Sequence, residues 1–155
     1  MFTHLNEKGE AVMVDIGGKI PTERTATGYA RIRMQADTLK KLLSSDLEKG
    51  DGLAVSRLAG IMGAKKTSEL IPLCHNIPID NVTVDFKAED ETSLAVYVNA
   101  KCTYKTGIEM EALTGAGIAA LAVYDMCKAI DRGMVIEEIK LIKKTGGKSD
   151  YINEG

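Results

Sequence analysis

Two stretches in which large apolar residues recur at every second position constrain the fold of this chain more than any other feature. Residues 82–87 read Val-Thr-Val-Asp-Phe-Lys, and residues 94–98 read Leu-Ala-Val-Tyr-Val. A period of two is typical of a strand with one buried face. Because only a polar turn at 90–92 separates the stretches, they predict a hairpin within an antiparallel sheet, with the second strand reaching about Tyr104.

Helical spacing lies on both sides of this hairpin. Leucines at 39, 42, 43 and 47 predict one helix, which Asp37 would cap, and a second helix is expected to run to about Lys66. A longer helix is expected over residues 108–131, where small and apolar residues dominate. Gly133 would end that helix as a C-terminal cap.

Two further strands, at 24–34 and 135–143, complete the predicted order of elements. The order strand, helices, strand, strand, helix, strand is that of the ferredoxin-like βαββαβ fold. We therefore expect an α+β protein with one antiparallel sheet and helices on one face. The other face of the sheet must be polar or covered.

Length and composition bound the class of protein. The 155 residues fit a single domain, with residues 1–21 irregular and residues 145–155 forming a mobile tail. A net charge of −2 disfavours a nucleic-acid binder. Three cysteines without a CxxC pair indicate free thiols in a reducing compartment. With no signal-peptide pattern, and an apolar stretch at 118–123 too short to span a bilayer, we expect a cytoplasmic protein that does not contact a membrane.

Three parts of the sequence resemble known site motifs but do not meet the requirements of those motifs. Residues 115–120 fit G-x-G-x-x-A but lie inside the predicted long helix, where the glycines suit close helix packing rather than a dinucleotide turn. Gly147-Lys148-Ser149 lacks the first glycine of a P-loop, because Ile142 stands there. The cysteines and histidine lack the short ligand spacing of a zinc site, so no metal site is expected.

Cys74 and His75 form an adjacent pair in a segment that Pro72 and Pro78 keep out of a helix interior. Polar side chains on such rigid, irregular backbone are common at binding sites. A plain loop with Cys74 buried as a small hydrophobe is the other interpretation.

The long helix carries a second candidate group. Glu111, Asp125 and Lys128 fall on nearly the same helical face, and Asp125 and Lys128 are neighbours at i,i+3. An exposed ion pair without function is the plain alternative. Glu111 and Asp125 lie about 21 Å apart along the helix, so either a symmetric partner subunit brings its Glu111 beside this Asp125, or the two residues serve different parts of the site.

Three long segments closely resemble the MoaC family of molybdenum-cofactor biosynthesis. They are residues 66–75 (Lys-Thr-Ser-Glu-Leu-Ile-Pro-Leu-Cys-His), 105–114 (Lys-Thr-Gly-Ile-Glu-Met-Glu-Ala-Leu-Thr) and 123–128 (Val-Tyr-Asp-Met-Cys-Lys). Residues 13–15, 49–51 and 144–149 fit as well, so the resemblance covers nearly the whole chain. Asn76-Ile77-Pro78 departs from the Pro-Leu pattern that follows Cys-His in many members.

The resemblance implies a reaction and an assembly. The family converts 3′,8-cyclo-7,8-dihydroguanosine 5′-triphosphate into cyclic pyranopterin monophosphate and releases pyrophosphate. It implies a ferredoxin-like homohexamer, a trimer of dimers, with the pocket between subunits. No cofactor is expected, and a role for Mg²⁺ with the triphosphate stays open. A non-catalytic module that binds purine nucleotides or pterins is the alternative function.

The resemblance also implies roles for single residues. The family's catalytic positions fall on Asp125, Lys128 and Lys49, which suit proton transfer and the stabilisation of developing phosphate charge. The substrate-binding positions fall on Leu73, Cys74, His75, Glu109, Met110, Glu111, Lys144 and, more weakly, Arg24. Cys74 is not expected to act as a nucleophile, because nothing adjacent in sequence would activate its thiolate.

Overall fold

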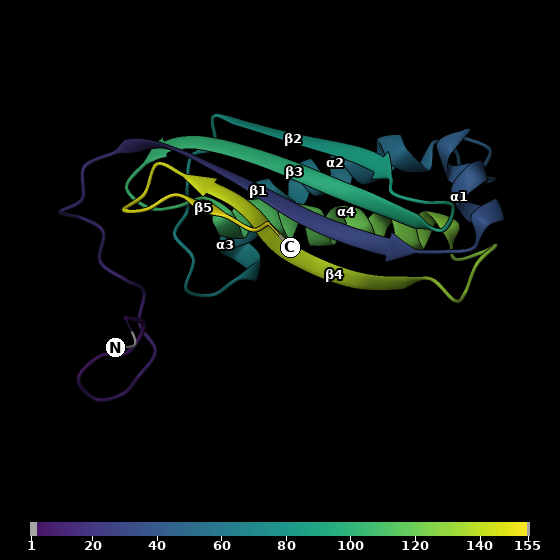
Figure 1. Cartoon of the computed structure of the whole chain (residues 1–155). Helices are drawn as coiled ribbons and strands as arrows, with labels where there is room; N and C mark the ends of the chain where they lie inside the picture. The colour runs from purple at the N-terminus through teal and green to yellow at the C-terminus, as the bar shows by residue number, and fades with distance from the viewer. Residues whose placement is uncertain (1–2, 155) are drawn as a thin grey trace.

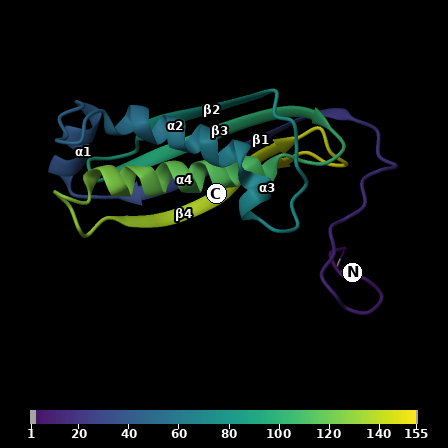
Figure 2. The ribbon, with the colours of Figure 1, turned by 180° about the vertical axis from the view of Figure 1, so that it is seen from behind.

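Five strands form one antiparallel sheet in the computed structural model, which describes residues 3–154. The sheet order is β2-β3-β1-β4-β5, with strands β1 (Thr22–Arg33), β2 (Asn81–Ala88), β3 (Ser93–Tyr104), β4 (Val135–Thr145) and β5 (Tyr151–Ile152). The helices are α1 (Ala36–Leu43), α2 (Gly52–Lys65), α3 (Thr67–Leu70) and α4 (Glu109–Cys127). Figures 1 and 2 show α2 and α4 side by side on one face of the sheet. The α+β class predicted from the sequence is confirmed.

The predicted hairpin is confirmed as β2 and β3. Their register places Val84 opposite Val98 and Phe86 opposite Val96. Val84, Val96 and Val98 are buried in the main core, together with Ala116, Ala119 and Val123 of α4. The alternating apolar residues therefore form the face on which the helices pack.

The open face of the sheet is polar, as a one-sided helix layer requires. Tyr29 and Arg31 alternate along β1 with the buried Ala30 and Ile32 and so point to the opposite face. The ring of Tyr29 packs edge-on against Tyr97, with the ring centroids 5.3 Å apart. Ion pairs continue the polar surface, joining Arg31 to Glu137 and Glu138, and Lys140 to Glu138.

Small residues let α2 and α4 approach closely, as the glycines at 115–120 predicted. A Cβ atom added to Gly115 would lie 3.0 Å from the carbonyl oxygen of Gly60. One added to Gly28 of β1 would fall on the carbonyl group of Ala112, which leaves no room for a side chain under the first turns of α4. These contacts fix the helix that carries most of the predicted site.

Two predicted helix ends are wrong. Helix α4 ends at Cys127 rather than near 131, and the chain continues as a turn in which the N–H of Ile130 donates to the carbonyl oxygen of Cys127, three residues back. Gly133 therefore does not cap the helix. Helix α1 begins after Gln35, and Asp37 lies within its first turn instead of capping it.

The terminal segments pack against the fold to different degrees. Figure 1 shows the N-terminal segment running away from the sheet, with an isolated bridge between Leu5 and Ala11. The C-terminal tail forms β5, which pairs with residues 143 and 144 of β4. The single domain over residues 1–155 and the mobility of the tail stay predictions, and Met1, Phe2 and Gly155 lie outside the described residues.

Helix α4 is the one helix of residues 3–154 whose length and composition would allow it to cross a membrane. Half of its apolar window is buried inside the fold. Buried residues of α4 belong to both hydrophobic clusters of the protein. These are the properties of a core helix, which passes the same test of length and composition.

Candidate active site

The predicted site residues gather at the two ends of α4. Glu109, Met110 and Glu111 form its first turn, Asp125 lies in its last turn, and Lys128 is its C-cap residue. Glu111 and Asp125 are fourteen positions apart, which corresponds to about 21 Å along the helix axis. The structure thus presents two groups of side chains, which we call the carboxylate pocket and the Asp-Lys cluster.

The carboxylate pocket is a cavity of about 340 Å³ at the start of α4. It brings together three segments that are distant in sequence: the N-terminal segment, the Cys-His segment and the turn leading into α4. Its lining includes Thr3, His4, Val14, Ile16, Lys19, Leu73, Cys74, His75, Ile77, Thr106, Gly107, Glu109, Met110 and Glu111. Six of the predicted substrate-binding residues therefore share one cavity.

His75 connects two walls of the carboxylate pocket. Its Nε2 atom lies 2.6 Å from the backbone carbonyl oxygen of Val14, 61 residues earlier in the chain. Val14, Ile16 and Lys19 were not predicted as site residues, because their segment has no regular pattern. The Met13-Val14-Asp15 motif was the one sequence signal that could have pointed to them.

Two carboxylate oxygens in the pocket lack partners among the described residues. They are Oε2 of Glu109 and Oε2 of Glu111, and both are buried. Glu111 is only 3% exposed, and its burial, together with the nearby charge of Glu109, raises its pKa to about 7. Buried acceptors without donors are costly, so a ligand that offers N–H or O–H groups would be bound favourably here.

The Cys74 thiol is not activated by this environment. Burial and the negative charges of Glu111 and Glu109 all raise its pKa. A thiol with a raised pKa carries little thiolate at neutral pH and is a poor nucleophile. Cys74 therefore serves as part of the pocket wall.

Two basic residues lie next to the pocket without lining it. Lys144 of β4 places its Nζ atom 3.1 Å from Oε1 of Glu109. Arg24 of β1 donates from Nε to the carbonyl oxygen of Tyr104 and from Nη2 to that of Lys105, at 3.0 and 3.4 Å. Arg24 thus supports the turn that enters α4, while Lys144 reaches the pocket through Glu109.

The Asp-Lys cluster consists of Asp125, Lys128 and Lys49. Nζ of Lys128 lies 2.8 Å from Oδ1 of Asp125, and Nζ of Lys49 lies 3.7 Å from Oδ2 and 3.1 Å from the backbone oxygen of the same residue. The side chains of Asp125, Lys128 and Lys49 are 60%, 54% and 44% exposed. Hydrogen bonding and charge from Lys128, with a smaller contribution from Lys49, lower the pKa of Asp125, and Asp125 raises the pKa of Lys128.

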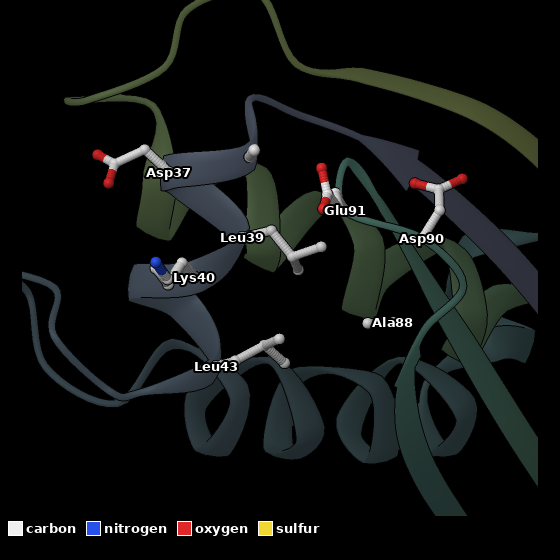
Figure 3. Close-up of a pocket in the computed structure, with 8 residues that line it drawn as sticks. Asp37, Leu39, Lys40, Leu43, Ala88, Asp90 and Glu91 are labelled. Atoms are coloured by element: carbon white, nitrogen blue, oxygen red, sulfur yellow. The ribbon is translucent and has the colours of Figure 1, made fainter.

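A larger cavity elsewhere in the fold contains none of the predicted site residues. It measures about 460 Å³ and lies between α1 and the turn of the β2-β3 hairpin. In Figure 3, Leu39 and Leu43 point toward the turn that carries Asp90 and Glu91. Three carboxylates and one lysine line this cavity, which would repel a polyphosphate.

We expect the free energy of unfolding to fall as pH rises toward neutrality, through Glu111. Its pKa is raised from 4.5 to about 7, so between these values the folded protein keeps a proton that the unfolded chain has released. This shift corresponds to about 3 kcal/mol, lost between about pH 4.5 and 7. Glu111→Gln should remove the loss and be more stable than the wild type at pH 8, as measured by urea unfolding.

The exposed Glu7 offers the matched control, because Glu7→Gln should leave the pH dependence of unfolding at the wild-type slope. An equal slope for wild type and Glu111→Gln would contradict the assignment of this loss to Glu111.

Comparison with known proteins finds relatives that match nearly the whole chain. The model of the MoaC family matches residues 13–147. Proteins named cyclic pyranopterin monophosphate synthase from Peptoclostridium acidaminophilum and Clostridium acetobutylicum are 55% and 53% identical to it, over 99% and 96% of this chain and 98% and 93% of their own. One with the same name from Brevibacillus brevis is 49% identical, over 99% of this chain and 96% of its own. The chain belongs to the MoaC family.

Proposed function

We propose that this protein is a cyclic pyranopterin monophosphate synthase, a lyase of molybdenum-cofactor biosynthesis. Its substrate is 3′,8-cyclo-7,8-dihydroguanosine 5′-triphosphate, and its products are cyclic pyranopterin monophosphate and pyrophosphate. The observation that carries the proposal is identity of 49% to 55%, over nearly the full length, with three proteins of that name. The geometry of both groups of side chains agrees with the chemistry.

The carboxylate pocket suits the ring system of this substrate. A guanine-derived ring presents N–H and NH₂ donors, and the pocket holds two buried carboxylate oxygens without donors of their own. Leu73, Met110 and Cys74 would supply the apolar contact around them. His75 and Lys144 complete the proposed binding set at the edge of the pocket.

The Asp-Lys cluster suits the phosphate chemistry and the proton transfers. Formation of the cyclic phosphate joins a substrate hydroxyl oxygen to the α-phosphorus, breaks the bond to pyrophosphate and passes the hydroxyl proton to a base. Two ammonium groups beside one carboxylate can stabilise the negative charge that develops on the phosphates. Asp125 and Lys128, which lie in contact, are the groups that we assign to the proton transfers of ring rearrangement.

A second copy of the chain would unite the two groups. A twofold axis near residue 118, midway between Glu111 and Asp125, would place the pocket of one subunit beside the cluster of the other. Leu58 and Met62 of α2 and Leu121 of α4 are more than half exposed, which favours an apolar contact on the helix layer. We therefore include a homo-oligomer with composite sites in the proposal, as a hexamer built from three dimers.

The finer fold and the location belong to the same proposal. The antiparallel order β2-β3-β1-β4, with helices after β1 and β3, supports the ferredoxin-like βαββαβ fold. Free thiols at Cys74, Cys102 and Cys127 support a cytoplasmic location. That the reaction requires no cofactor stays a prediction. A role for Mg²⁺ bound to the triphosphate substrate stays open.

A direct assay tests the function. The purified chain, given the cyclised triphosphate, is expected to release pyrophosphate and to form cyclic pyranopterin monophosphate in equal amounts. Tight binding of the triphosphate without pyrophosphate release would contradict the proposal and favour the binding module instead.

A further inference from the structure

Asp131 is a buried carboxylate that neither half of the proposed site uses. It is 3% exposed and lies four residues beyond the end of α4. Within residues 3–154 no lysine, arginine or histidine forms an ion pair with it. A buried charge without a counter-ion persists only where hydrogen bonds replace its hydration.

Three hydrogen bonds hold the Asp131 carboxylate. Oδ2 accepts from the backbone N–H of Gln35 at 2.8 Å and from the buried hydroxyl of Thr38 at 3.0 Å. Oδ1 accepts from the backbone N–H of Gly133 at 3.1 Å. Gln35 is the N-cap residue of α1 and makes no side-chain capping bond, so Asp131 satisfies the start of α1 from a distant segment.

We call Asp131 and its three hydrogen-bond donors the anchor. The backbone on the N-terminal side of Asp131 connects the anchor directly to Lys128. The Lys128 N–H donates to the Tyr124 carbonyl oxygen, and the Asp131 N–H donates to that of Cys127. These bonds tie the turn at residues 128–131 to the last turn of α4. The anchor and Lys128 therefore lie on one continuous piece of backbone.

The donors Gln35 and Thr38 connect the anchor to Lys49 through helix α1. Helix α1 ends at Leu43, and the loop that follows carries Lys49 to Asp125. At the start of α2, a Cβ on Gly52 would clash with Leu42 of α1 and touch Met126 of α4, so both side chains pack against the first turn of α2. The half-exposed contact between Lys49 and Asp125 is too weak to hold this loop alone.

We propose that Asp131 is a positioning residue that, through Thr38 and the first turn of α1, holds Lys49 against Asp125. The consequence for catalysis rests on the proposed function of the Asp-Lys cluster. The positioning itself can be measured without substrate.

Thr38→Val and Thr38→Ser form the test, read by NMR of ¹³C-methylated lysines with the Lys49 signal assigned through Lys49→Arg. Thr38→Val removes the hydroxyl at nearly constant volume, and we expect the Lys49 signal to move toward that of a free lysine. The kcat of cyclic pyranopterin monophosphate formation should fall about tenfold, roughly the loss expected when one hydrogen bond to a charged group is removed. Thr38→Ser keeps the hydroxyl and should restore both properties.

Gln35→Pro is the second variant, because it removes only the N–H that donates to Asp131. The φ of Gln35 is already −65°, which proline adopts without strain. Thr67→Val is the matched control: this buried hydroxyl donates to Gly63 and Ala64, at the opposite end of α2 from Gly52. It should lower the melting temperature and leave the Lys49 signal in place.

The proposal is overturned if folded Thr38→Val and Gln35→Pro keep the wild-type Lys49 signal, even with lower melting temperatures. Asp131 would then only stabilise the fold. Absence of synthase activity in the wild type would instead contradict the proposed function and leave the Lys49 measurement valid.

Discussion

Replacing Asp125 by Asn is expected to lower the rate of product formation at least a hundredfold while the melting temperature stays close to that of the wild type. Asn keeps the shape of the side chain but removes the charge that Lys128 and Lys49 contact. Loss of a positioned acid-base group typically costs about 10²- to 10⁴-fold in rate. Stability should change little, because the cluster is half exposed and such ion pairs contribute little to folding. Initial rates and thermal unfolding measure the two effects.

Lys128→Ala should give a loss of similar size, for the complementary reason that Asp125 then lacks its closest cation. The matched control is Lys101→Ala, which breaks another exposed ion pair, between Lys101 and Glu23 at 3.5 Å. That variant should keep the wild-type rate. Folded Asp125→Asn or Lys128→Ala protein with a near-normal rate would remove the residue from the catalytic proposal.

The local pattern of the sequence was enough to predict most of the sheet and the long helix. Apolar residues at every second position in 82–87 and 94–98 predicted a hairpin that β2 and β3 confirm, because alternate side chains of a strand point to opposite faces of the sheet. Helix α4 was predicted for the same kind of local reason. Its end was not, since the turn after Cys127 lies beside Asp131, whose hydrogen-bond partners Gln35 and Thr38 are more than 90 residues away in sequence.

The walls of the candidate site show the same limit. Motif resemblance pointed to Cys74, His75 and Glu111, and the structure gathers them in one cavity. The bond between His75 and Val14 could not be predicted, because it joins two irregular segments whose approach depends on the tertiary fold. The raised pKa of Glu111 likewise follows from its burial. A carboxylate at the start of a helix is usually exposed, so the sequence alone does not predict that burial.

Two inactive variants are expected to restore each other's activity when they share one oligomer. The carboxylate pocket and the Asp-Lys cluster lie at opposite ends of α4, about 21 Å apart, so one subunit cannot present both to a small substrate. In a mixed dimer of Glu111→Ala and Asp125→Asn subunits, one composite site carries both substitutions and the other carries neither. The mixed dimer should therefore recover up to half of the wild-type activity.

The most direct measurement co-expresses Glu111→Ala and Asp125→Asn chains with different affinity tags, isolates the doubly tagged oligomer and assays pyrophosphate release. Oligomers of each variant alone, and of one chain carrying both substitutions, are the controls and should be inactive. Doubly tagged oligomers are expected to recover up to half of the wild-type activity, while all three controls remain inactive. Mixed oligomers as inactive as the controls would contradict the claim that the two ends of α4 form one site across two subunits.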